Sequence, residues 1–249
     1  MKALIVAAAG MSTRFSRSLG RECLKCLYYK NSVKESLLYR VLAQPAAFDR
    51  YIIIGGYKFQ ELKEMVESEF QGIQREICLV YNEKFSEYGS GYSLFLGLKK
   101  ALELCADEVV FAEGDLYVDR QSYMSVYRAT GGVVTCNNEP ISADRSVAFY
   151  FDRSDKVHYI YDTGHNALAI EEPFLSIYNS GQVWKFSDMG LWKEIIRLFG
   201  EKQWEGTNLV PIEAYFNRLG RNHYEVIQFR KWVNCNTVAD FEAVQDIAE

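Results

Sequence analysis

The sequence has no hydrophobic segment typical of a signal peptide and no run of about 18 apolar residues. We therefore expect a cytoplasmic protein with no membrane partner. Basic residues are scattered and the net charge is −5, so we also expect no nucleic-acid partner. Internal repeats and Pro- or Ser-rich linkers are absent, and 49% of the residues are hydrophobic. The chain, 1–249, is therefore predicted to form a single domain with a large core.

Metal-binding and redox patterns are scarce as well. The six cysteines stand singly except for Cys23 and Cys26, which form a CxxC pattern. A zinc site needs a second pair of ligands, and no other cysteine, and none of the three histidines, lies at ligand spacing. We interpret the pair as reduced thiols that flank Lys25, and their redox role stays open.

Two familiar nucleotide-binding patterns, GxGxxG and GxxxxGK[ST], are also missing. The sequence instead begins with an apolar strand, Lys2 to Ala7, which leads into a turn of small residues. A turn with so few side chains lets backbone N–H groups approach a polyphosphate, although it could serve only strand-to-helix packing. A polar loop then leads to Lys25, a mobile positive charge. The candidate nucleotide-binding residues here are Ala8, Ala9, Gly10, Met11, Ser12, Thr13 and Arg14.

Hydrophobic patterns alternate between strand and helix in the first half, which indicates an α/β fold with a mostly parallel sheet. Ligands of such sheets lie beyond the carboxyl ends of the strands, where we expect Gly10, Gly56, Asn82 and Asp115 to converge. The second half is more mixed and is predicted to be partly antiparallel. Expected strands span 51–54, 77–81, 108–113, 133–136, 147–151, 157–161, 174–183 and 225–229; expected helices span 59–70, 91–105, 188–199 and 209–219, with another from 238.

Two further segments carry polar groups at element ends, and the first suggests a cation site. Asp115 follows a buried strand and can hold Mg²⁺ against a triphosphate, or it can be a turn residue. Thr237 and Asp240 form a capping-box pattern at the start of the last predicted helix. Asn236, immediately before this pattern, offers an amide oxygen.

Residues Ala8 to Arg14, followed by Lys25, resemble the A-A-G-x-G-x-R…K signature of nucleotidyltransferases with a glycosyltransferase-A-like fold. Ser12 stands where that family usually has Gly. The resemblance implies a Rossmann-like, mostly parallel mixed sheet with helices on both faces. It further implies Arg14 and Lys25 as catalytic residues, and Asp115 and Asn236 as Mg²⁺ ligands, with Asn236 replacing the usual Asp.

The segment from Val80 to Leu94, together with Gly56-Tyr57-Lys58, is similar to the LicC-like cytidylyltransferases that act on phosphocholine. This resemblance implies that Asn82, Ser90 and Ser93 contact the base and ribose of CTP. About 1–120 would then form the nucleotide-binding half, and about 121–249 the acceptor-binding half.

The expected reaction is transfer of CMP from CTP to a small phosphorylated acceptor, with release of pyrophosphate, for capsule or lipopolysaccharide biosynthesis. Phosphocholine and phosphoglutamine are the leading acceptors, with 2-aminoethylphosphonate and sugar 1-phosphates as alternatives. Trp204, Glu205 and Asn208 are the candidate acceptor contacts, and Arg145, Arg153 or Lys185 could neutralise an amino-acid carboxylate. A glycosyltransferase, an inactive nucleotide-binding module and a homodimer stay open.

Overall fold

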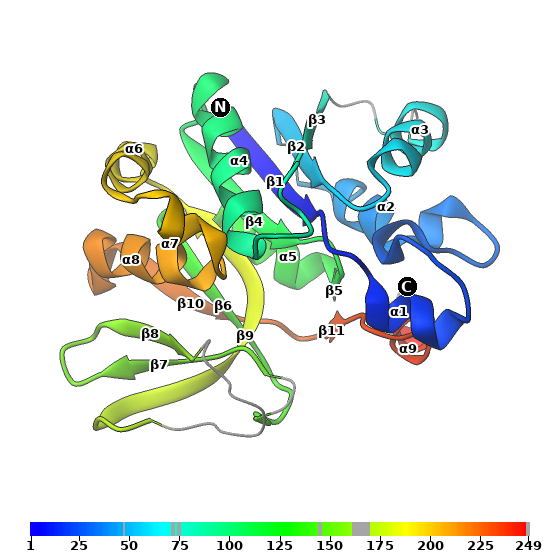
Figure 1. The fold of residues 1–249 in the computed structure, drawn as a ribbon. Coiled ribbons are helices and arrows are strands. Elements are labelled where there is room, and N and C mark those ends of the chain that lie inside the picture. Colours follow the sequence, from blue (N-terminus) through cyan, green and yellow to red (C-terminus); the bar gives the residue numbers. More distant parts are fainter. Residues whose placement is uncertain (47, 71–72, 74–75, 144–145, 161–169, 248–249) are drawn as a thin grey trace.

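A computed structural model describes residues 1–249 except 47, 71–72, 74–75, 144–145, 161–169 and 248–249. Within this part, one sheet has the strand order β10-β6-β9-β4-β1-β2-β3, and the β7–β8 hairpin joins it through β9 (Figure 1). Strands β4, β1, β2 and β3 are parallel, whereas β9 runs antiparallel between β4 and β6. The strands are β1 (Lys2–Ala8), β2 (Arg50–Gly55), β3 (Ile77–Tyr81), β4 (Glu108–Glu113), β6 (Gly132–Asn137), β7 (Ala148–Asp152), β8 (Val157–Ile160), β9 (Phe174–Phe186) and β10 (Tyr224–Gln228).

Helices cover both faces of the sheet, and each face buries its own apolar layer. On one face Leu94, Trp192 and Ile212 pack against Ile5 and Phe111; on the other, Leu38, Leu62 and Val126 pack against Val6 and Val110. The first layer uses α4 (Ser90–Glu103), α6 (Met189–Leu198), α7 (Glu201–Glu205) and α8 (Leu209–Leu219); the second uses α2 (Leu37–Leu42), α3 (Phe59–Glu69) and α5 (Arg120–Arg128). None of the helices in the described ranges is long and apolar enough to cross a membrane.

The strands and helices predicted from long hydrophobic patterns are confirmed, with shifts of a few residues at their ends. The predicted strand 157–161 corresponds to β8, and Tyr161 lies outside the described residues. The polar loop expected before Lys25 is wrong in part, because Thr13–Leu19 forms α1, with Phe15 buried on its inner face. Short elements were not predicted: α2, α5, α7, and the strand pair β5 (Leu116–Val118) and β11 (Trp232–Asn234).

The C-terminal helix α9 (Val238–Ile247) lies beside α1 (Figure 1). Phe241 is fully buried and its ring meets that of Tyr28, which in turn meets Phe15 of α1. The Ser18 hydroxyl also accepts a hydrogen bond of 3.0 Å from the backbone N–H of Val238. The C-terminal helix is therefore packed against α1 and Tyr28 in one small cluster next to the turn after β1.

Among the residues that the structure describes, strand β8 pairs only with β7, so its outer backbone edge needs partners from elsewhere. Side chains of α8 supply them. Asn217 accepts from the Val157 N–H at 2.9 Å and donates to the Val157 carbonyl at 2.8 Å. The Glu213 carboxylate accepts from the Tyr159 N–H at 2.7 Å. Helix α8 thereby covers an edge that would otherwise be open to pairing with another strand.

Replacing Asn217 with Ala is expected to lower the free energy of unfolding by about 2 kcal/mol, since it leaves two part-buried backbone groups without their partner. Urea denaturation of the purified protein measures this change. Arg218→Ala, on an exposed neighbouring position, is the matched control and is expected to stay within about 0.5 kcal/mol of the parent. Equal stabilities for the two variants would show that the Asn217 bonds contribute nothing.

Candidate active site

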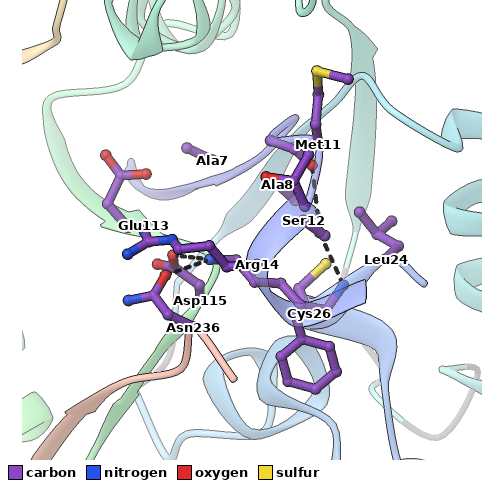
Figure 2. A pocket seen from close by; sticks show the side chains of 15 residues that line it. Ala7, Ala8, Met11, Ser12, Arg14, Leu24, Cys26, Glu113, Asp115 and Asn236 are labelled. Carbon is purple, nitrogen blue, oxygen red and sulfur yellow. Dashed lines mark hydrogen bonds and ion pairs between the residues drawn. The ribbon is translucent and has the colours of Figure 1, made fainter. Parts of the chain in front are cut away.

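The candidate site is assembled by the short antiparallel pair β5–β11. This pair aligns Leu116 with Asn234, and the Cys235 N–H donates to the carbonyl oxygen of Asp115 at 2.9 Å. Asp115 follows β4, and Asn236 follows β11, so the pairing places two residues that are distant in the sequence side by side. Figure 2 shows their side chains together on one wall of a pocket.

That pocket has a volume of about 230 Å³ and lies beyond the carboxyl ends of β1 and β4. One side is formed by the turn after β1, including Ser12 and Met11, and the opposite side by Glu113, Asp115 and Asn236 (Figure 2). Of the residues predicted for a nucleotide or metal site, the lining includes Ala8, Gly10, Met11, Ser12, Thr13, Arg14, Lys25, Asp115 and Asn236.

Lys25 connects the two walls. Its ammonium forms an ion pair with Asp115 and lies 3.3 Å from the amide oxygen of Asn236. Asn236 donates through its Nδ2 to the side-chain oxygen of Asn234 at 3.0 Å, which leaves Oδ1 turned toward Lys25. A positive charge is thus bound between two oxygen atoms at the floor of the pocket.

Ser12 gives the turn its shape. Its φ of 55° lies in the left-handed region, where glycine is favoured and other residues are strained. The Ser12 hydroxyl accepts a hydrogen bond of 3.1 Å from the backbone N–H of Lys25. The Ser12 side chain therefore strains the backbone at this position and also links the turn to Lys25 through a hydrogen bond.

The predicted capping box is present at the start of α9. The Asp240 carboxylate accepts from the Thr237 N–H at 2.7 Å and from the Asn236 N–H at 2.9 Å, and the Asp240 N–H donates to the Thr237 hydroxyl at 3.3 Å. The cap therefore fixes the backbone of Asn236 as well as the helix end.

Glu113 is a pocket residue that the sequence reasoning did not single out. Its carboxylate accepts from the Asn208 Nδ2 at 2.5 Å. Burial, reinforced by the nearby charge of Asp115, raises the pKa of Glu113 to about 8. The available signal was an acidic residue ending an otherwise apolar strand, two positions before Asp115.

Four residues predicted near the nucleotide do not line this pocket. Asn82 and Ser93 are buried and bonded to each other at 3.0 Å. Ser90 is the first residue of α4, after the N-cap Gly89, and its hydroxyl accepts from the Asn208 N–H at 3.0 Å. Ala9 lies behind the turn, where its carbonyl accepts from the Tyr57 N–H at 3.3 Å.

The predicted acceptor contacts also lie outside the pocket lining. Trp204 is buried between the rings of Phe95 and Phe199, Glu205 is exposed, and Asn208 reaches the pocket only through Glu113.

The three candidate cations for an acceptor carboxylate are placed differently from one another. Lys185 is buried and pairs with Glu108 at 3.0 Å, and Arg153 is exposed. Arg145 lies outside the described residues.

Cys23 and Cys26 are free thiols and both are buried. Burial raises the pKa of the Cys26 thiol to about 12 and also raises that of Cys23. Because the thiolate is the reactive form, this environment disfavours redox and metal chemistry at the pair.

The fold has well-matched relatives among solved structures. The inositol-1-phosphate CTP transferase from T. maritima superimposes with a TM-score of 0.66 at 15% identity, covering 100% of this chain and 97% of that one. CTP:phosphocholine cytidylyltransferase (LicC) from Streptococcus pneumoniae gives 0.61 at 15%, covering 100% and 99%. A protein assigned as a glucose-1-phosphate thymidylyltransferase from Bacillus anthracis, in complex with a sucrose, gives 0.70 at 14%, covering 100% and 95%.

These likenesses confirm the predicted nucleotidyltransferase fold, a mostly parallel mixed sheet with helices on both faces. Residues 21–248 match the family described as "Domain of unknown function (DUF6564)", and the chain belongs to that family. No curated protein matched the sequence.

The raised pKa of Glu113 predicts how stability changes with pH. The folded protein keeps this proton up to about pH 8, whereas the unfolded chain releases it near 4.5. The free energy of unfolding should therefore fall as pH rises between these values. In chelator-treated protein, Glu113→Gln is expected to lose this part of the pH dependence in urea denaturation at several pH values. Glu205→Gln, at an exposed position, should keep the parental slope, and a parental slope in Glu113→Gln would contradict the assignment.

Proposed function

We propose that the protein is a nucleotidyltransferase that transfers CMP from CTP to a small phosphorylated acceptor and releases pyrophosphate. The observation that carries this proposal is the Lys25–Asp115–Asn236 cluster at the floor of a pocket lined by the turn after β1. The fold is that of proteins described as a CTP transferase and a CTP:phosphocholine cytidylyltransferase, which favours CTP as the nucleotide.

The turn around Gly10 is suited to a triphosphate. A Cβ atom at Gly10 would meet no protein atom within 4 Å, so the fold itself does not require a glycine here. The open backbone faces the pocket, and the first N–H groups of α1 have no acceptor within their helix. Arg14 lines the same pocket and offers a fork of donors that matches phosphate oxygens.

The residues on the opposite wall fit Mg²⁺. This ion prefers oxygen ligands and is commonly bound by one or two carboxylates plus the phosphates of the substrate. Asp115 supplies a carboxylate and Asn236 a neutral amide oxygen, both already turned toward a positive charge, that of Lys25. When bound, Mg²⁺ would neutralise phosphate charge, and Lys25 could then turn its ammonium to the phosphate under attack.

The proposed chemistry needs no covalent intermediate. An acceptor phosphate oxygen attacks the α-phosphorus of CTP, a new P–O bond forms, and the bond from the α-phosphorus to the pyrophosphate oxygen breaks in line. The acceptor phosphate is already ionised, so no general base is required. Lys25 and Arg14 act by positioning the phosphates and stabilising the charge of the transition state.

Phosphocholine and phosphoglutamine are proposed as acceptors, with 2-aminoethylphosphonate and sugar 1-phosphates as alternatives. The likeness to a phosphocholine cytidylyltransferase supports the first. The burial of Trp204 among other rings gives no support to an open aromatic cage at that residue. Asn208, the N-cap of α8, is coupled to the pocket through Glu113. This hydrogen bond is one of the contacts between the start of α8 and the nucleotide half.

The test is pyrophosphate release from CTP and Mg²⁺ with each of the four acceptors separately, and with UTP or GTP in place of CTP. We expect release with CTP and one acceptor. Release with a different triphosphate would correct the nucleotide, whereas CTP binding without turnover on any acceptor would contradict the transferase.

Lys25→Ala is expected to reduce the rate by roughly 10²–10³, because it removes a donor that stabilises transition-state charge. Lys34→Ala, at an exposed position, is the control and should retain the parental rate in the same pyrophosphate assay. A Lys25→Ala enzyme with the parental rate would refute its catalytic role.

Gly10→Ala tests the turn. The thermal midpoint should be unchanged, because the added methyl meets no protein atom. Titrated CTP should bind about tenfold more weakly, a change of about 1.4 kcal/mol. Gly114→Ala is the matched contrast: its Cβ would lie 2.6 Å from the Ala7 carbonyl oxygen, so it should lower stability. Unchanged CTP binding by Gly10→Ala would place the nucleotide elsewhere.

A further inference from the structure

A second group of ligand-type side chains lies on the outer face of the β7–β8 hairpin. His158 Nε2 is 3.2 Å from Asp152 Oδ2 and 3.9 Å from Glu172 Oε1. Together the three residues place one ligand atom each within 4.8 Å of one another. In Figure 1 this hairpin lies well away from α1 and β5, which flank the nucleotide pocket.

A hydrogen bond from His158 Nε2 can satisfy only one of the two carboxylates in this group. The Nε2 atom of an imidazole carries at most one proton, yet two carboxylates direct oxygen atoms at it. Those two negative charges repel each other across the same short space. A divalent cation between the three atoms would satisfy all of them.

Two of the three spacings between ligand atoms are close to those around a small tetrahedral ion. Zn²⁺ binds His nitrogen and carboxylate oxygen at about 2.0–2.2 Å, which separates neighbouring ligand atoms by about 3.3–3.6 Å. The two distances from Nε2, 3.2 Å and 3.9 Å, lie on either side of this range. Small side-chain adjustments would therefore bring all three atoms into coordination.

Each ligand is already oriented by a neighbour. Asp152 Oδ1 accepts from the N–H groups of Ser154 at 2.7 Å and Lys156 at 3.0 Å, leaving Oδ2 free to face His158. The Tyr150 hydroxyl donates to Glu172 Oε1 at 2.7 Å.

The His158 ring is held as well. The Tyr150 ring stacks on it with centroids 5.1 Å apart. Glu213 Oε1 lies 4.0 Å from Nδ1, so a carboxylate faces the nitrogen that would carry the ring proton when a metal is bound at Nε2.

We propose that Asp152, His158 and Glu172 bind one Zn²⁺ ion, with a fourth position open to solvent. The site is separate from the proposed nucleotide and Mg²⁺ site. It joins the tip of the hairpin to the segment that enters β9, on the side where Glu213 attaches α8. It does not depend on the transferase proposal, and its test uses no activity measurement.

The experiment is calorimetric titration of the protein with ZnCl₂ in saturating Mg²⁺, which keeps Zn²⁺ from the proposed Mg²⁺ site. A Cys105→Ser background is used, because Cys105 is an exposed thiol. We expect one equivalent of Zn²⁺ to bind and the thermal midpoint to rise. His158→Ala should abolish both effects, whereas His223→Ala, at an exposed position, should preserve them.

Two milder variants guard against a folding defect in His158→Ala. Glu172→Gln alters a half-exposed side chain and should lose most Zn²⁺ affinity while its metal-free thermal midpoint stays parental. Tyr150→Phe, which removes an orienting hydroxyl, should weaken Zn²⁺ binding about tenfold. Absence of Zn²⁺ binding to the parent, or equal affinity in Glu172→Gln and the parent, would overturn the site.

Discussion

The pairing of β5 with β11 is the constraint on which the candidate active site depends. Each strand has only three residues, and without their pairing Asp115 and Asn236 would have no reason to meet. The capping box of α9 then fixes Asn236 from behind, and the cluster of Phe15, Tyr28 and Phe241 fixes α9 against α1. The turn after β1 and the proposed metal ligands are thus held in one connected set of contacts.

Charge at the pocket floor explains why an amide suits position 236. Lys25 lies against one carboxylate, that of Asp115, with Glu113 close by. Glu113 keeps its proton up to about pH 8, so an Asp at 236 would place a second negative charge beside the single ammonium, and the repulsion between these two charges would grow in such a partly buried space. Asn236 supplies an oxygen without that charge. The charges of Lys25 and Asp115 therefore balance before any ligand binds. Binding of a negatively charged triphosphate would favour binding of an additional cation.

The helices and strands differ physically in ways that determine whether the sequence alone could predict them. Long amphipathic or apolar segments such as β4 and α8 were predicted almost to the residue, because burial of one face imposes a period on them. The pairs β5–β11 and α1–α9 depend on tertiary contacts between short segments, which leave no period. The turn after β1 and Lys25 were singled out from their small and basic residues, and their resemblance to a known signature strengthened that interpretation. Glu113 was missed because a single acidic residue at a strand end carries no pattern, and its Asn208 partner is distant in the sequence.

Because β11 and α9 come late in the sequence, they are synthesised after the other elements of the site. This order has a consequence for folding in the cell. The ribosome makes β1, α1 and Lys25 first, and the central parallel strands can pair while the remainder is still being made. The contact of Lys25 and Asp115 with Asn236 can form only after nearly the whole described chain has emerged. The same holds for the packing of Phe241 near Phe15. A nascent chain can therefore form the central parallel strands and the turn after β1 early, whereas the pocket wall that contains Asn236 is completed only once β11 and α9 have emerged.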